Sequence, residues 1–211
     1  MTDFEKTVLK LDARYQIENT MSRYAFYLSS GSFDEIPALF SDDPDVRAEM
    51  NWGVYDGPEG IERLYSVYHA EVMAGPGVMV YHTTTTPVIE VAGDLKTAKG
   101  VWISSGHMSG GPFTPDNSVK AFWAWFKWGC DFINEGGEWK IWHLHCFGSF
   151  VCPFEKPWTD TGDVHTEPEL ADRYRPDRPP THHWAYSPEG IVENVPAPPK
   201  PYGTFDPATA F

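Results

Sequence analysis

Apolar side chains follow a helical repeat through the first third of the chain. Between residues 8 and 28 they recur every three or four positions, which predicts one long amphipathic helix. Its apolar stripe consists of Ile17, Met21, Tyr24 and Leu28. Gly31 then permits a tight reversal, and Ser32 with Glu35 has the spacing of a capping box. A second, short helix is therefore expected to run through residue 40.

The pattern then changes to strands that flank one more helix. Residues 46–54 predict a strand with a turn at 51–53, and Pro58 suits the first position of a third helix that runs to about residue 73. Four longer strands are predicted at residues 78–91, 97–108, 119–134 and 139–150. A hairpin turn at 134–138 joins the last two. This order predicts an α+β domain in which helices pack on a curved antiparallel sheet.

The composition changes after residue 150. Many of the 19 prolines lie in this part of the chain, including four in the segment 196–201, but aromatic residues persist. They are Trp158, Tyr174, Trp184, Tyr186, Tyr202 and Phe205. Because a disordered linker carries few aromatic residues, residues 151–211 are expected to form an ordered, extended, Pro-rich arm. The arm would pack on its own domain, residues 1–150, or on a neighbouring subunit.

The order of these elements resembles the nuclear transport factor 2-like superfamily, in particular its SnoaL-like branch. The shared features are the helical stripe of Tyr24, the 32–35 segment, the turn at 55–58 and the pair Tyr81-His82. The resemblance covers residues 8–150 and implies a cone, in which a curved sheet and three N-terminal helices enclose a deep apolar pocket. The superfamily includes ketosteroid isomerase, scytalone dehydratase, bile-acid dehydratase, cyclases and noncatalytic transport factors. The fold therefore selects no single activity.

Three positions can be matched to the site residues of these relatives. Tyr24 is similar in position to the pocket tyrosine of ketosteroid isomerases and bile-acid dehydratases. His82 lies on the strand on which scytalone dehydratase and related lyases place a catalytic histidine, and His107 lies on the strand that supplies a second polar group in several dehydratases. The resemblance implies that these three side chains take part in catalysis.

The chain also departs from its relatives. Ser29 stands where dehydratases carry an aspartate, and Ala48 stands where the isomerase base falls. No carboxylate occurs at residues 128–130, the best match for the second acid of the isomerase. Steroid isomerisation by the known set of residues is therefore disfavoured.

The residue types of the candidate site suit proton transfer. Period two in a strand places His82 on one face with Val80 and Thr84, and an imidazole with a pKa of about 6.5 can take and return a proton. A structural histidine that hydrogen-bonds to threonine or a carbonyl is the alternative. Tyr24 faces the core, and its hydroxyl either points at a substrate oxygen, where it would stabilise negative charge, or binds backbone.

Two further histidines share one strand face. His143 and His145 are separated by one residue, so that with His82 and His107 they could form a cluster in the cone. No metal is expected, because His-x-His is a weak signal and no matching carboxylate is evident. Acid-base catalysis for His143 and substrate binding for His145 are the preferred roles. The alternative is a pair on the outer face at an oligomer contact.

Aromatic side chains are the remaining candidates for substrate binding. Phe126 and Trp128 share a strand face, whereas Lys127 lies on the opposite face and marks it as the outer one. Phe126 and Trp128 are therefore expected to line the pocket and stack on a planar ligand. Phe40 and Tyr55 complete the set, with the core or a subunit interface as the competing position.

Composition and charge limit the possible partners. Hydrophobic residues make up 41% of the chain and aromatic residues 15%, enough for a core and an aromatic-lined cavity. A formal charge of −14 disfavours nucleic acid and anionic membranes. The chain contains neither an apolar run long enough to span a bilayer nor a basic leader, so that a soluble cytoplasmic protein is expected. Its three cysteines form no zinc or disulfide pattern.

These observations favour a cofactor-independent lyase that acts on an apolar aromatic or polycyclic small molecule. His82 would remove a proton, and Tyr24 with His143 or His107 would stabilise the oxyanion or protonate the leaving oxygen. Dehydration is the preferred reaction, and a retro-aldol release of an aldehyde needs the same groups. An isomerase or cyclase with the same pocket, and a noncatalytic binding domain, are the alternatives. A homo-oligomer, a dimer or a trimer, is expected.

Overall fold

The computed structural model of the protein describes residues 1–110, 118–160, 170–183 and 185–211. Its helical elements are α1 (Asp3–Ser30), η1 (Phe33–Glu35), η2 (Pro37–Leu39), α2 (Gly57–Glu62), η3 (Arg63–His69), α3 (Ala70–Val72), η5 (Asp172–Tyr174) and η6 (Pro207–Thr209). Its strands are β1 (Arg47–Met50), β2 (Gly53–Asp56), β3 (Met79–His82), β4 (Thr85–Val91), β5 (Thr97–Ser109), β6 (Ala121–Glu135) and β7 (Glu138–Pro153). Among the described residues, no helix is long and apolar enough to cross a membrane.

Helix α1 begins and ends at residues that suit helix termini. Thr2 and Glu5 form a capping box at its start, and Gly31 at its end has a left-handed φ of 72° that other residues adopt only at a cost. The buried face of the helix includes Ile17, Met21, Tyr24 and Leu28. The stripe expected from the sequence is therefore confirmed.

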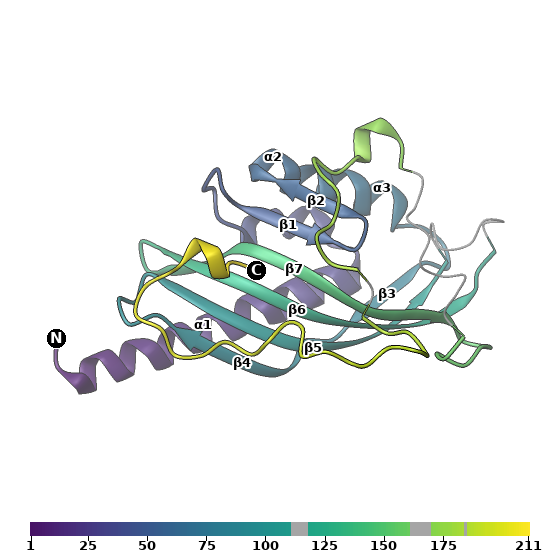
Figure 1. The fold of residues 1–211 in the computed structure, drawn as a ribbon. Coiled ribbons are helices and arrows are strands. Elements are labelled where there is room, and N and C mark those ends of the chain that lie inside the picture. Colours follow the sequence, from purple (N-terminus) through teal and green to yellow (C-terminus); the bar gives the residue numbers. More distant parts are fainter. Residues whose placement is uncertain (111–117, 161–169, 184) are drawn as a thin grey trace.

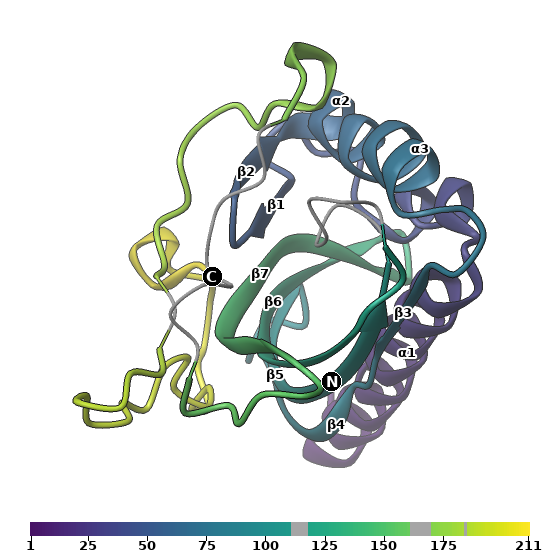
Figure 2. The same cartoon turned by 90° about the vertical axis from the view of Figure 1, so that its right-hand side faces the viewer.

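The strands form one curved sheet in the order β2-β1-β7-β6-β5-β3, with β4 also paired to β5 (Figures 1 and 2). Neighbouring strands from β3 to β7 are antiparallel, whereas β1 pairs with β7 in parallel. The expected α+β fold with a curved sheet is confirmed, but the sheet is mixed rather than wholly antiparallel. A parallel pair needs a long connection, and here the rest of the domain separates β1 from β7.

Two local predictions fail in the helical region. Ser32 makes no side-chain capping bond, and the expected short helix is replaced by the 3₁₀ turns η1 and η2. Pro37 has no backbone N–H to donate, so a continuous α-helix cannot form there. The third helix forms as expected between Gly57 and Val72, but its central part, η3, is π-helical.

The inner face of the sheet packs against α1 and the helices α2 to α3 (Figure 2). On β6 the residues that face the core alternate as expected, and they are Phe122, Ala124, Phe126, Trp128 and Cys130. Lys127 points to the opposite face, where its Nζ donates to the carbonyl of Val195 in the arm. The face assignment drawn from Lys127 is therefore confirmed.

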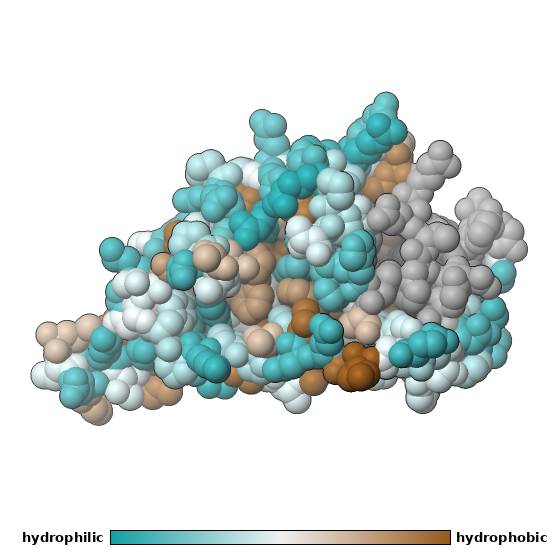
Figure 3. Space-filling view, viewed as in Figure 1, coloured by the Kyte–Doolittle hydropathy of each residue, from teal (hydrophilic) through white to brown (hydrophobic). Residues whose placement is uncertain are grey.

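The first part of the C-terminal segment 170–211, with η5, packs beside the helices, where Tyr174 contacts Tyr68 of η3, and the part from Thr181 onward lies across the outer face of the sheet (Figures 1 and 2). Gly93 N–H donates to the Tyr202 carbonyl, and Ala185 N–H donates to the Gly148 carbonyl of β7. Its chain is mostly extended, and the part of it seen in Figure 3 carries both polar and apolar side chains. Of the arm aromatics named above, Trp184 lies outside the described residues. Within the described part, the arm packs on its own domain.

Candidate active site

Six polar side chains point into the interior between the inner face of the sheet and the helices, and they come from five different elements. They are Tyr24 on α1, Tyr65 and His69 on η3, His82 on β3, Ser104 on β5 and Trp128 on β6. Each is buried among the core side chains. A polar group placed in such surroundings without a protein partner has lost its water, and it can recover that free energy only by binding a ligand or an ordered water.

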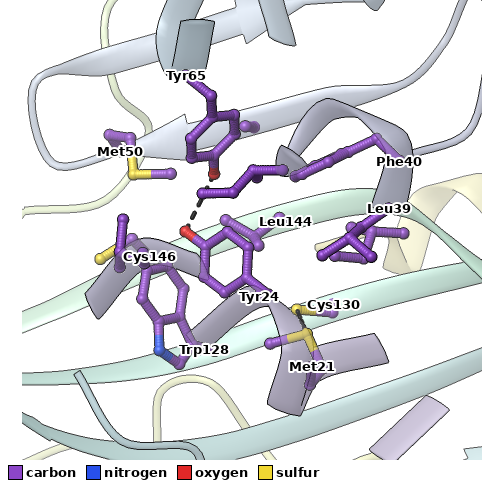
Figure 4. Close-up of a cluster of buried hydrophobic side chains, with 14 of the residues drawn as sticks. Met21, Tyr24, Leu39, Phe40, Met50, Tyr65, Trp128, Cys130, Leu144 and Cys146 are labelled. Atoms are coloured by element: carbon purple, nitrogen blue, oxygen red, sulfur yellow. Dashed lines mark hydrogen bonds between the residues drawn. The ribbon is translucent and has the colours of Figure 1, made fainter. Parts of the chain in front are cut away.

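Two tyrosine hydroxyls form the centre of this set. The Oη atoms of Tyr24 and Tyr65 are 3.0 Å apart, and the two hydroxyls point at one another (Figure 4). The ring of Tyr24 also packs edge-on against Trp128 at 5.6 Å. Burial raises the pKa of both tyrosines well above the ordinary value of 10. Both phenols therefore stay protonated, and one of the two O–H groups remains free to donate to a third oxygen.

His82 faces the interior from the end of β3. It pairs in register with Gly106 of β5, and a Cβ on that residue would lie 2.3 Å from His82 Nδ1, so only glycine leaves room for the ring. The ring packs on Phe126 at 4.8 Å. Its buried Nδ1 finds no hydrogen-bond partner among the described residues. Burial, with smaller effects of charge on His107 and His69, lowers the pKa of His82 to about 3.

His69 is a candidate that the sequence pattern did not reveal. Its Nδ1 lies 2.7 Å from the carbonyl oxygen of Leu64. Because a carbonyl oxygen can only accept a hydrogen bond, Nδ1 carries the proton, and Nε2 is the basic nitrogen. The ring stacks on Tyr65 at 5.2 Å, and burial lowers the pKa of His69 to about 4. The four-residue spacing of Tyr65 and His69 on a helix was the one available signal. The π-helical winding of η3, which often marks functional sites, was not predictable.

Two further polar atoms on the inner face lack partners. Ser104 Oγ and Trp128 Nε1 are buried, and neither makes a hydrogen bond within the described parts of the chain. Ser104 is two residues from Gly106, against which His82 packs, and Trp128 contacts Tyr24. Phe126 and Trp128 are alternate residues of one strand, about 7 Å apart along it. Phe126 contacts His82 and Trp128 contacts Tyr24, so these two rings lie between His82 and the tyrosine pair.

His143 and His145 lie on the outer face, so the expectation that they join His82 in the cone is wrong. His143 Nδ1 lies 2.8 Å from Asp131 Oδ2, and Lys99 Nζ donates to Asp131 Oδ1 at 2.6 Å. The arm covers this network, because the backbone N–H of Phe211 also donates to Asp131. A bulge on β7 between the partners of Asp131 and Phe132 decides which of its residues face outward.

A second outer-face network surrounds His145. His145 Nε2 is 3.1 Å from Glu49 Oε1, and that oxygen also accepts from the hydroxyl of Thr181 in the arm. Burial alone would raise the pKa of Glu49, but the nearby His145 and Thr181 hold it at about 2. Among the described residues, no three histidine, cysteine or acidic side chains are placed to hold a metal ion.

The other candidates occupy different surroundings. His107 is exposed on the outer face and packs on Trp123 at 5.0 Å, so the expectation that it shares the pocket with His82 is wrong. Tyr55 is buried, but its hydroxyl accepts from Trp52 and donates to the Tyr174 carbonyl, which leaves it no free proton for a ligand. Phe40 packs on the ring of Tyr65 at 5.6 Å as part of the core.

The two histidines buried on the inner face, His69 and His82, predict a loss of stability in acid. Both have an unfolded pKa of about 6.5 and lower folded values, so that below this pH the unfolded chain binds more protons and the free energy of unfolding falls. Between about pH 7 and about pH 5 each should remove about 2 kcal/mol. His69→Gln should abolish the part of this acid-induced loss of unfolding free energy that His69 causes, as measured by urea unfolding at the two pH values. An unchanged acid loss in this variant would contradict the assignment.

Comparison with known proteins identifies the fold. A family model described as a SnoaL-like domain matches residues 9–145. A candidate scytalone dehydratase from Novosphingobium aromaticivorans superposes with a TM-score of 0.56 at 13% identity, over 72% of this chain and 94% of that chain. The hexachlorocyclohexane dehydrochlorinase LinA-type3 from Novosphingobium barchaimii gives a TM-score of 0.54 at 18% identity, over 70% of this chain and 93% of that chain.

A third solved structure, a nuclear transport factor 2-like superfamily protein from Salmonella enterica, gives a TM-score of 0.52 at 15% identity, over 65% of this chain and 91% of that chain. No curated protein matches the chain. Similarity at such low identity shows a common fold and by itself assigns no activity. The family model, however, spans well over half of the chain. The protein therefore belongs to the SnoaL-like family of the nuclear transport factor 2-like fold.

Proposed function

We propose that the protein is an acid-base lyase that eliminates water from an uncharged, apolar small molecule bound on the inner face of the sheet. The observation that carries the proposal is His82, a buried neutral imidazole whose Nδ1 has no partner among the described residues. The Tyr24–Tyr65 pair supplies a hydrogen-bond donor on the same face. A base and an oxyanion donor facing one apolar interior suit proton abstraction next to a carbonyl.

The proposed reaction needs only groups that the chain itself carries. His82 takes a proton from the carbon next to a substrate carbonyl, and the C–H electrons form an enolate whose oxygen accepts from the tyrosine pair. The enolate electrons then form a C=C bond as the neighbouring C–O bond breaks. The proton on His82 goes to the departing oxygen, which leaves as water. An imidazole with so low a pKa returns its proton readily, and the enolate beside it stabilises the transient imidazolium.

The described residues place no buried lysine, arginine or carboxylate on the inner face, which favours an uncharged substrate. The buried charged side chains of the described residues are Glu49, Lys99 and Asp131, and all three contact the arm on the outer face. Residues 111–117, 161–169 and 184 contain no lysine or arginine. Among the described residues, no buried lysine or arginine therefore lies on the inner face to offset the desolvation of a carboxylate or phosphate there. A ring with one carbonyl or hydroxyl can instead stack on Phe126 or Trp128 and bind the tyrosine pair.

Two other functions use the same groups. In an isomerase or cyclase His82 would return the proton to another carbon, and in a retro-aldol lyase a C–C bond would break and release an aldehyde. A noncatalytic binding domain is the third candidate. It has less support, because a simple apolar binding site does not need a buried imidazole and a tyrosine pair with free hydrogen-bonding capacity.

A screen that resolves product masses tests the proposal and separates these candidates. We expect neutral cyclic β-hydroxy ketones, including polycyclic ones, to lose one water, and the matching carboxylates and phosphates to remain unchanged. Products of unchanged mass would identify an isomerase, and release of an aldehyde would identify a retro-aldol lyase. Binding without turnover by any member of the panel would contradict the enzyme proposal.

The pH dependence of turnover provides a separate test. The low pKa of His82 keeps the free base present throughout the mildly acidic range. We therefore expect kcat/KM to stay level from about pH 7.5 down to about pH 5.5, within the range in which the protein remains folded. A base of ordinary pKa would instead lose about half of its activity at about pH 6.5. An inflection at that pH would indicate another base.

A further inference from the structure

Helix α1 is apolar on two opposite faces. One face carries Ile17, Met21, Tyr24 and Leu28 into the core. The first turns of the helix extend beyond the sheet, and the N-terminus lies at the tip of this projection (Figure 1). Apolar surface remains visible among polar atoms along this end of the molecule (Figure 3). Within the described part of the chain, large apolar side chains of this end of α1 stay exposed.

Four large apolar side chains make up this second face, which we call the outer seam. They are Phe4, exposed to 77%, Val8 to 47%, Leu11 to 63% and Tyr15 to 68%. Their spacings of four, three and four residues are those of alternating d and a positions in a heptad. At about 100° per residue the seam lies almost opposite the buried stripe of the same helix. The pattern ends where Glu18 takes the next d position.

We propose that the outer seam pairs with the same seam of a second copy of this chain, as a short two-helix coiled coil. A β-branched residue at an a position and leucine at a d position favour two-stranded pairing, and Val8 and Leu11 occupy these positions. The four side chains expose roughly 500 Å² on each copy, or roughly 1,000 Å² for the pair. That area reaches the lower limit for a specific protein interface.

The charges beside the seam agree with a parallel pair of helices. In that register the g position of one helix faces the next e position of the other, which places Thr7 opposite Asp12 and Arg14 opposite Asn19 of the second copy. No like charges meet in these pairs. In the antiparallel register e positions face each other, and Glu5 would meet Asp12. A membrane is a poorer occupant, because the net charge of −14 opposes binding to anionic lipid.

The mass of the protein in solution tests the pairing. We expect the wild-type chain to dimerise through the seam. Leu11→Glu should halve the mass measured by sedimentation equilibrium at about 50 μM, roughly fifty times a dissociation constant of about 1 μM. Phe4→Glu should act in the same direction. Phe26→Glu is the matched control, because Phe26 is 75% exposed on the same helix but lies beyond Glu18 and Ser22, outside the seam. It should leave the mass unchanged.

These substitutions replace exposed side chains, so thermal unfolding at low protein concentration should shift little in all three variants. A monomeric wild type at this concentration would overturn the proposal. So would an oligomer whose mass Leu11→Glu leaves unchanged, or one that Phe26→Glu dissociates equally. Leu11→Cys, beside the three buried native cysteines, should form an oxidised dimer in the parallel register, and failure to cross-link would overturn that register.

Discussion

Replacing His82 by glutamine is expected to lower turnover of the dehydrated substrate by ~100 to 10,000-fold, the usual loss when a general acid-base group is removed. Glutamine keeps much of the side-chain volume between Gly106 and Phe126 but cannot accept and return a proton in this way. Folding should therefore change much less than turnover. The measurement is single-turnover kinetics beside thermal unfolding of both proteins.

His107→Gln is the matched control. His107 lies one residue from Gly106, the register partner of His82, but on the exposed outer face of β5. Its removal should change turnover less than about two-fold, because surface substitutions away from a site are close to neutral. Tyr24→Phe should lower turnover while the ring stays packed on Trp128. Equal losses in the His82 and His107 variants would show that His82 is not the base.

Asp131→Ala is expected to destabilise the fold by about 3–5 kcal/mol. Asp131 is fully buried and accepts from the Lys99 ammonium, and it also binds His143 and the backbone N–H of Phe211. Removing the carboxylate leaves a buried cation without its counter-charge. The free energy of unfolding in urea should fall accordingly, and the end of the arm should lose protection from hydrogen exchange.

A double variant separates the effect of the unpaired Lys99 ammonium from the effect of the packing lost with the Asp131 side chain. Lys99→Met together with Asp131→Ala removes both members of the ion pair and should recover at least half of the lost stability. As a control, Glu18→Ala breaks the exposed pair with Arg14 and should cost less than about 0.5 kcal/mol. A cost below about 1 kcal/mol for Asp131→Ala would contradict a buried, structurally required pair.

Regular periodicity explains why much of the fold was predictable. The stripe of α1 and the alternation of β6 depend on backbone geometry alone, so Tyr24, Phe126 and Trp128 were placed on the correct faces before any tertiary structure was known. Period two also placed His82 on one strand face with Val80, and in the structure both are buried. These predictions needed only the type of element and one residue whose burial was certain.

Local interruptions of the pattern explain the failures. His143 and His145 were placed together, correctly, but the side of the sheet on which they lie depends on pairing with β6 and on a bulge that has no signature in the sequence. His69 was missed because it takes part in the set only through the π-helical winding of η3 and its contact with Tyr65. The parallel pairing of β1 with β7 joins segments nearly a hundred residues apart, and no local pattern records it.

The sequence by itself determined the order of the elements, the buried face of α1, the faces of β6 and the resemblance to the SnoaL-like family. The elements and their faces follow from short-range periodicity, which each segment carries within itself, whereas the family follows from the resemblance of their order and motifs. Only the tertiary structure decided that Tyr24 meets Tyr65, that His82 loses its water, and that the arm covers Asp131, His143 and Glu49. Those facts are contacts between distant segments, and a contact acquires its chemistry only when folding brings both partners out of water.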